Sequence, residues 1–184
     1  FVKLTNDLNM TNPLFTGIGD GDIVDNKYVY NEFAGTFDGD NHNIKLNIYK
    51  NFVSGLFNAS SGIIKNVKTS GTVFTANRVA GGIVGYQIGG TVSNCENNAK
   101  VSGRFYKDGK GHIGGIVGYS KGTITNCVNN GDVYGNVTKY ADNQGVGGIV
   151  GTAENIEVSN CVNNGVVTNF GFSTGGIIGV VRKS

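Results

Sequence analysis

The chain has 184 residues, with 31 glycines, one proline and no tryptophan, and its length suits a single domain. Its formal net charge is only +2, so no strong field directs it to nucleic acid or to an anionic membrane. No stretch approaches the roughly 20 consecutive apolar residues of a transmembrane helix. We therefore expect neither nucleic-acid binding nor membrane insertion.

The first 33 residues precede the repeated part of the sequence. They open with FVKLTNDLNM, without an initiator methionine or a signal peptide, so we expect a fragment of a larger protein. Residues 1–184 are treated as one domain, in which residues 1–33 form an N-terminal lead-in and residues 34–184 form the repeats. The lead-in is expected to cover the first repeat, because an open end would expose strand edges and core.

Two acidic segments lie near this end of the chain. The sequences DGDIVD at 20–25 and DGDN at 38–41 place carboxylates on glycine-rich turns, and calcium prefers such hard oxygen ligands. The calcium candidates are Asp20, Asp22, Asp38 and Asp40. Neither segment is an EF-hand loop, and Asp-Gly pairs are also ordinary turns. We predict no cofactor and no other metal.

One six-residue phrase occurs four times in the rest of the chain. GGIVGY at 81–86 recurs at 114–119, as GGIVGT at 147–152 and as GGIIGV at 175–180. Longer copies follow it, such as KGTITNCVNNGDV at 121–133. Self-similarity with a period of about 30 residues is typical of solenoids and other repeat arrays.

The pattern inside each repeat favours strands over helices. Short runs rich in valine, isoleucine and threonine are bounded by glycine and asparagine, and about three such strands fill one period. Propeller blades need about 40 residues or more. We therefore predict an all-β fold, a parallel β-helix (β-solenoid) of about five rungs, right-handed as parallel crossovers usually are.

Stacked rungs would place equivalent residues above one another at about 4.8 Å. The expected inward aliphatic stacks are Ile83, Ile116, Ile149 and Ile177, and Ile64, Val92, Ile124 and Val158. Asparagine can form hydrogen-bonded ladders and tolerates the left-handed conformation of tight turns. Its columns are Asn66, Asn94, Asn126 and Asn160; Asn97, Asn129 and Asn163; and Asn98, Asn130 and Asn164. Each Gly-Gly pair is expected to turn a corner where a Cβ would clash or where φ is positive.

These phrases resemble the GLUG repeat of large secreted or surface proteins, most of them bacterial. The resemblance rests on GTFDGDNHNI at 35–44, on the degenerate copy at 54–73, and on the later GGIVG and GTITNCVNNGDV copies. LTNDLNM…FTGIGD at 4–20 is similar to the segment that precedes such repeats. The family includes adhesin-like proteins and the non-catalytic parts of immunoglobulin A proteases. The resemblance implies a β-solenoid and an extracellular location, but no shared active site. The chain departs from the family pattern at Asp40-Asn41, where the family prefers Asn-Gly, and at Asn58, which replaces the last glycine of the first copy.

The cysteines Cys95, Cys127 and Cys161 occupy one repeat position, which Val67 fills in the first copy. We interpret them as a stack of buried free thiols. A disulfide between neighbouring rungs is the alternative, because the rung spacing lies within the usual Cα–Cα range. A zinc site is not expected, since the cysteines lack the usual ligand spacing and have no histidine nearby.

No motif for catalysis is present. The two histidines, His42 and His112, are not part of an HExxH motif, and no GxSxG elbow occurs. Many β-helices degrade polysaccharides, but a glycosidase needs two carboxylates that flank a groove, and the acidic residues of the repeats are scattered. We expect no enzyme, with a polysaccharide-degrading β-helix as an alternative.

Tyrosine marks the candidate binding residues, because its ring offers contact area with a polar tip. These residues are Tyr86, Tyr106, Tyr119, Tyr134 and Tyr140. The segments 105–112 and 134–144 lengthen their rungs, and variable loops on one side of a solenoid often form its binding face. The alternative is that these loops only fill corners.

The sequence therefore predicts a non-catalytic extracellular module of a bacterial surface or secreted protein. It would act as an adhesin or rigid stalk that binds a host protein or glycan. The alternative is an accessory domain that positions substrate for a secreted protease.

Overall fold

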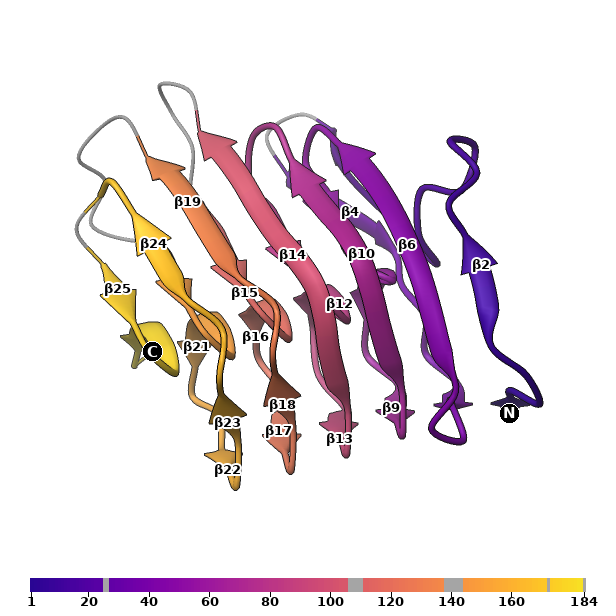
Figure 1. Cartoon of the computed structure of the whole chain (residues 1–184). Coiled ribbons are helices and arrows are strands. Elements are labelled where there is room, and N and C mark those ends of the chain that lie inside the picture. Colours follow the sequence, from indigo (N-terminus) through magenta and orange to yellow (C-terminus); the bar gives the residue numbers. More distant parts are fainter. Residues whose placement is uncertain (25–26, 106–110, 138–143, 172, 184) are drawn as a thin grey trace.

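The computed structural model describes residues 1–24, 27–105, 111–137, 144–171 and 173–183; within these ranges the side chains of residues 21–24, 27–30, 105 and 137 are left out. The described residues form strands and turns without a helix, and parallel strands stack as a β-solenoid (Figure 1). The two ends of the chain lie at opposite ends of the stack. The predicted all-β fold class, a parallel β-solenoid, is confirmed.

Each rung passes through four parallel sheets in turn. The first sheet contains the short strands β1 (Val2–Lys3), β5 (Thr36–Asp38), β9 (Ile63–Lys65), β13 (Thr91–Ser93), β17 (Thr123–Thr125) and β22 (Val158–Ser159). The long sheet contains β2 (Leu8–Met10), β6 (Asn43–Lys50), β10 (Lys68–Thr75), β14 (Glu96–Phe105), β18 (Val128–Asn129) with β19 (Val133–Val137), and β23 (Val162–Asn163) with β24 (Val167–Asn169).

The chain then returns behind the long sheet. The third sheet contains β7 (Val53–Ser54), β11 (Val79–Gly81), β15 (His112–Gly114), β20 (Gly145–Gly147) and β25 (Thr174–Gly175). The fourth sheet contains β8 (Phe57–Ser60), β12 (Val84–Gln87), β16 (Val117–Ser120), β21 (Val150–Glu154) and β26 (Ile178–Arg182). Only the hairpin of β3 (Asp20–Val24) and β4 (Lys27–Asn31) is antiparallel among the described strands.

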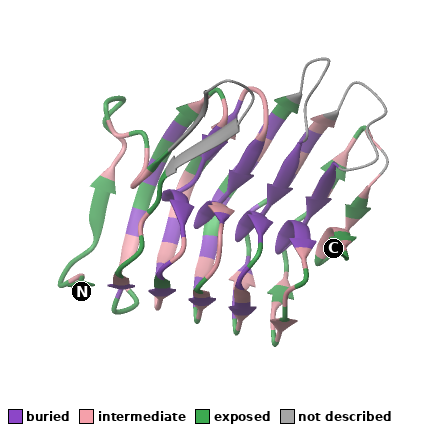
Figure 2. Cartoon of the chain, turned by 180° about the vertical axis from the view of Figure 1, so that it is seen from behind, coloured by how far each residue is buried: buried purple, intermediate pink, exposed green. Residues whose placement is uncertain are grey.

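The core lies between these sheets and follows the predicted stacks. Ile83, Ile116 and Ile149 are fully buried. Ile177 continues this column beside Ile149 but is 38% exposed, because no described rung covers it. The second column runs in register through the first sheet, as Phe37, Ile64, Val92, Ile124 and Val158. Buried residues concentrate in the middle rungs, whereas the strands at both ends carry exposed positions (Figure 2).

The lead-in packs on the N-terminal end of this core. Phe15, Ile18 and Phe33 contact the buried cluster, and Phe33 lies 5.1 Å from Phe57 between ring centroids. Asn58 fastens the same segment, since its side-chain amide donates to the carbonyl oxygens of Thr16 and Gly19, both at 2.9 Å. The departure from the repeat pattern at Asn58 therefore serves the attachment of the lead-in.

Asparagine corners and ladders hold the rungs together. Asn66, Asn94, Asn126 and Asn160 have φ between 53° and 54°, the left-handed conformation predicted for this column. The buried ladder forms as expected: Asn97 Nδ2 donates to Asn129 Oδ1 at 2.7 Å, and Asn129 Nδ2 donates to Asn163 Oδ1 at 2.8 Å. The ladder on the outer surface forms too, through the equivalent amide contacts of Asn98, Asn130 and Asn164.

Glycine is required in pairs at the corners because a larger residue would not fit there. None of the Gly-Gly pairs at 81–82, 114–115 or 147–148 has a positive φ, so that alternative is wrong. A Cβ at Gly82 would overlap the side chain of Asn97 and the carbonyl oxygen of Gly115 in the next rung. Close approach of the backbone to the asparagine ladder is therefore the reason for glycine here.

Candidate binding surface

Tyr86 and Tyr119 form a packed pair rather than an open surface. Their rings stack in register on β12 and β16, with centroids 4.7 Å apart and an angle of 10° between the planes. Val53 and Val79 of the third sheet complete a small cluster around Tyr119, which is only 4% exposed. The expectation that Tyr119 offers its ring to a partner is therefore wrong, and Tyr86 is half-buried against it.

Polar groups complete the enclosure of Tyr119. Its hydroxyl donates to Glu154, whose carboxylate also pairs with Lys121 at 3.2 Å. The guanidinium of Arg182 lies 5.6 Å from the ring centroid, and the buried His112 ring contacts the same tyrosine edge-on. These contacts hold the corner between the third and fourth sheets in place. They give Tyr119 a structural role that needs no ligand.

Tyr134, another of the tyrosines predicted to bind a partner, does lie on an outer face. It is half-buried on β19 and points outward, because its neighbours Val133 and Gly135 are buried. Tyr106 and Tyr140 lie outside the described residues. The candidate binding surface is therefore the outward face of the long sheet, which is the broad near face of Figure 1.

An aromatic column crosses this outward face from rung to rung. In register it reads Tyr49, Phe74, Ser102, Tyr134 and Thr168. Tyr49 and Phe74 stack with centroids 4.8 Å apart and an interplanar angle of 17°. Tyr49 is 69% exposed, and Phe170, 71% exposed, contacts Tyr134 edge-on at 5.9 Å. Exposed aromatic rings on a flat face are typical of recognition surfaces.

Two exposed cations flank the aromatic column. Lys100 and Arg104 lie on β14 on either side of Ser102, and both are exposed. Among the described carboxylates none forms an ion pair with these two residues, whereas Lys68 on the same face pairs with Glu96 at 3.7 Å. A shallow hollow of about 100 Å³ lies beside Tyr134 and is lined by Lys100, Asp132 and Val166, among others. Sequence reasoning missed Tyr49, Phe74 and this pair of cations.

Three of the four acidic calcium candidates form ion pairs or hydrogen bonds within the protein. Asp38 Oδ1 accepts hydrogen bonds from the Asn66 side chain at 2.9 Å and from the backbone N–H of Asp40 at 3.0 Å, and Oδ2 pairs with Lys65 at 3.2 Å. Asp40 pairs with Lys3 at 3.1 Å, and Asp20 pairs with Lys50 at 3.0 Å. The side chain of Asp22 lies outside the described residues. Among the described side chains, no three of His, Cys, Asp or Glu gather as a metal site.

Asp38 makes the stability of the first corner depend on pH. The hydrogen bond from Asn66, then that from Asp40, and the contact with Lys65 lower the pKa of Asp38 from 3.8 to about 2. A carboxylate whose pKa is lowered by folding stabilises the folded protein at any pH above its pKa in the unfolded chain. This stabilisation is lost as the pH falls through the pKa of the folded state. We expect the urea midpoint of the protein to fall between about pH 5 and about pH 2, and to fall less steeply in Asp38→Asn. Equal slopes in both proteins would contradict this role.

The cysteines form the predicted stack of free thiols. Cys95 and Cys127 are buried, Cys161 is partly buried, and none of the three is in a disulfide. The hydrogen bond with Cys161 favours the Cys127 thiolate, but the hydrogen bond with Cys95 and burial outweigh it, and the pKa of Cys127 is raised to about 12. A thiol that stays protonated at neutral pH is a poor nucleophile and metal ligand.

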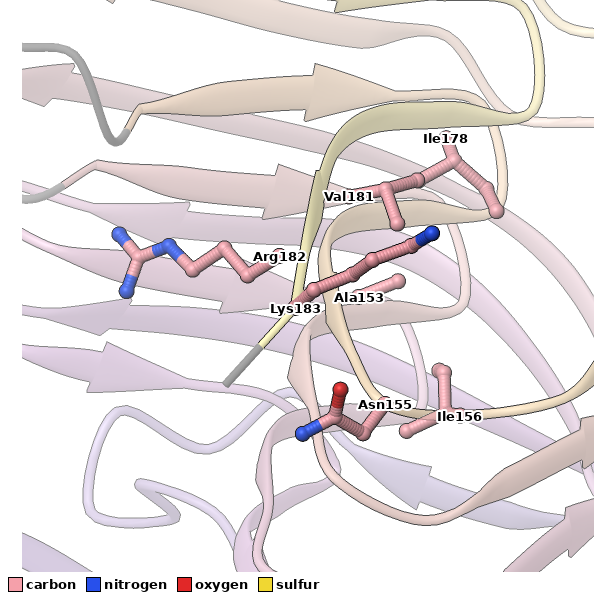
Figure 3. A pocket seen from close by; sticks show the side chains of 7 residues that line it. All are labelled: Ala153, Asn155, Ile156, Ile178, Val181, Arg182 and Lys183. Carbon is pink, nitrogen blue, oxygen red and sulfur yellow. The ribbon is translucent and has the colours of Figure 1, made fainter.

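A second hollow lies at the C-terminal end of the core. It has a volume of about 360 Å³ and lies on the last described rung, with Ile178 and Val181 on one side and Asn155 and Ile156 on the other (Figure 3). Ile156 and Ile178 also contact the buried core. The hollow is therefore the uncovered cross-section of the solenoid rather than a shaped ligand site. None of the described residues forms a helix able to span a membrane.

The fold and its surface define a repeat module: stacked, asparagine-laddered rungs that present one broad outer face. Comparison with known families shows three copies of the GLUG motif, at residues 76–102, 109–134 and 142–168. The chain thus contains three GLUG motifs, which confirms the predicted resemblance. The degenerate copy at 54–73 lies outside these matches, although β9 occupies the same place in the first sheet as β13 and β17. Curated proteins and solved structures give no match.

Proposed function

We propose that the chain is a non-catalytic extracellular module of a bacterial surface or secreted protein, which acts as an adhesin or rigid stalk. The outward face of the long sheet would bind a host protein or glycan. The observation that carries the proposal is the stacked aromatic pair of the exposed Tyr49 and the half-buried Phe74, followed in register by Tyr134. Lys100 and Arg104 flank this column, and neither pairs with a described carboxylate. The GLUG repeats support a repeat module of this kind.

The ladders between rungs support the stalk part of the proposal. The amides of Asn97, Asn129 and Asn163 connect three rungs inside the protein, and a second ladder connects the same rungs outside. Such continuous hydrogen bonding resists bending and shear between rungs, because any slip breaks several bonds together. A rigid body of this kind can hold a binding face away from its point of attachment.

The acidic residues support a non-catalytic role. Five described carboxylates are each paired with a lysine, namely Asp20, Asp38, Asp40, Glu96 and Glu154. A glycosidase instead keeps two carboxyl groups about 5–10 Å apart across a groove, with one of them held as an acid. The lowered pKa of Asp38 runs against the raised pKa that a general acid needs.

Binding to an immobilised mucin, before and after enzymatic removal of its glycans, tests the proposal. We expect the triple variant Tyr49→Ser, Phe74→Ser and Tyr134→Ser to bind about tenfold less, because it removes the stacking surface but no core residue. The control is Val162→Ser, which changes an exposed residue at the other end of the same sheet. Undiminished binding by the triple variant would contradict the assigned face. Loss of binding on removal of the glycans would identify the ligand as a glycan.

A further inference from the structure

The aromatic column of the long sheet has one vacant position. Phe74 and Tyr134 lie on β10 and β19, and the strand between them, β14, contributes Ser102 at the same register. Successive strands are about 4.8 Å apart, so Phe74 and Tyr134 are separated by about 9.6 Å at the backbone. Ser102 is the smallest member of the column between them. We call this position the Ser102 slot, bounded by Phe74, Ser102 and Tyr134.

The width of the Ser102 slot matches the thickness of one ring. A ring placed midway would lie about 4.8 Å from each wall. The neighbouring pair, Tyr49 and Phe74, shows this spacing in the protein, with ring centroids 4.8 Å apart. The slot floor is a hydroxyl, which can donate or accept a hydrogen bond. The slot therefore accepts a ring with an apolar face and polar edges, which describes a pyranose.

Charge selects which kind of pyranose would bind. Lys100 and Arg104 stand two residues before and after Ser102 on the same side of β14, about 6.6 Å away along the strand. Both are exposed, and neither pairs with a described carboxylate. An arginine presents a planar fork that matches a carboxylate. A carboxylate on the ring would therefore meet a cation at either end of the slot.

We propose that the Ser102 slot binds an acidic pyranose, a uronic-acid residue of a polysaccharide, with its ring between Phe74 and Tyr134 and its carboxylate on Lys100 or Arg104. This inference rests on the proposed function and names its ligand class.

Calorimetric titration with hexagalacturonate tests the slot, with the fully methyl-esterified hexamer as the matched neutral ligand. We expect hexagalacturonate to bind and the ester to bind at least about tenfold more weakly, because a charge-assisted hydrogen bond is lost. Ser102→Phe fills the slot with a ring that continues the stack and should abolish binding while the protein stays folded. Lys100→Gln and Arg104→Gln should each weaken binding severalfold.

Lys45→Gln is the control variant, since it removes an exposed cation from the same face on β6, away from the slot. It should leave the affinity within about twofold, as expected for a remote surface charge. No binding of hexagalacturonate, or equal binding by Ser102→Phe, would overturn the proposal. Equal affinity for an oligothymidylate would also overturn it and assign the slot to nucleic acid. If the protein binds mucin through Tyr49, Phe74 and Tyr134 but not hexagalacturonate, only the ligand class fails and the proposed function stands.

Discussion

Gly115→Ala is expected to lower the free energy of unfolding by about 3 kcal/mol or more, in the range of strongly disruptive core substitutions. A Cβ on Gly115 would overlap the carbonyl oxygen of Gly148 in the next rung and the side-chain amide of Asn129 in its own. Both groups belong to the interior, where backbone and ladder leave no free volume. The chain can accept the methyl group only by separating two rungs or by breaking the ladder.

Gly89→Ala provides the matched control for this substitution. A Cβ at Gly89 would have no neighbouring atom within 4 Å, and its φ is not positive. The same glycine-to-alanine change should therefore be neutral or stabilise the protein by up to about 1 kcal/mol through the unfolded chain. Urea unfolding followed by far-ultraviolet circular dichroism measures both variants. A Gly115→Ala protein as stable as Gly89→Ala would contradict the crowded corner.

Asn129→Ala is expected to cost about 2–4 kcal/mol, because it leaves buried polar groups without partners. Asn129 is fully buried and connects three rungs. Its Oδ1 accepts from Asn97, and its Nδ2 donates to Asn163 Oδ1 and to the carbonyl oxygen of Gly131 at 2.7 Å. Alanine removes all of these bonds together and leaves a cavity, so the penalties of lost hydrogen bonds and lost packing add.

The adjacent residue on the outer surface separates burial from ladder formation. Asn130 makes the same kind of inter-rung amide contacts, with Asn98 at 3.0 Å and with Asn164 at 2.8 Å, but it is exposed. Asn130→Ala should cost less than about 1 kcal/mol, because water replaces the lost partners. Denaturant unfolding of both variants gives the comparison. Similar losses at the two positions would show that burial is not what makes the inner ladder important.

Much of the fold could be predicted from the sequence because the repeats place identical residues at identical positions. The phrase NCVNNG determines three features at once: an asparagine in the left-handed conformation, an inward cysteine and a buried asparagine ladder. Backbone conformation, burial and hydrogen bonding all favour the same residues in this phrase, so the local sequence is enough to predict the structure there. The Gly-Gly corners were less certain, since crowding and positive φ both select glycine. Only the three-dimensional position of the next rung distinguishes the two causes.

The candidate site was harder to predict for two physical reasons. The burial of Tyr119 depends on the third sheet folding back beside the fourth, which brings Val53 and Val79 against the ring from distant parts of the chain. The aromatic column depends on register: Tyr49 and Phe74 lie in rungs where the repeat is degenerate, so their equivalence to Ser102 and Tyr134 is not apparent from the repeated phrase. Alignment of the alternating segments of β6, β10 and β14 would have revealed it.

Amide chemical-shift mapping of the labelled protein with hexagalacturonate tests the central claim most directly. The account predicts that the largest shifts fall on Lys100, Ser102 and Arg104 and on their neighbours Phe74 and Tyr134, all on the outward face of the long sheet. The amides around Tyr119, at the opposite corner, should stay unchanged. Shifts centred on the Tyr119 cluster, or no shifts at saturating ligand, would contradict a binding site on the long sheet.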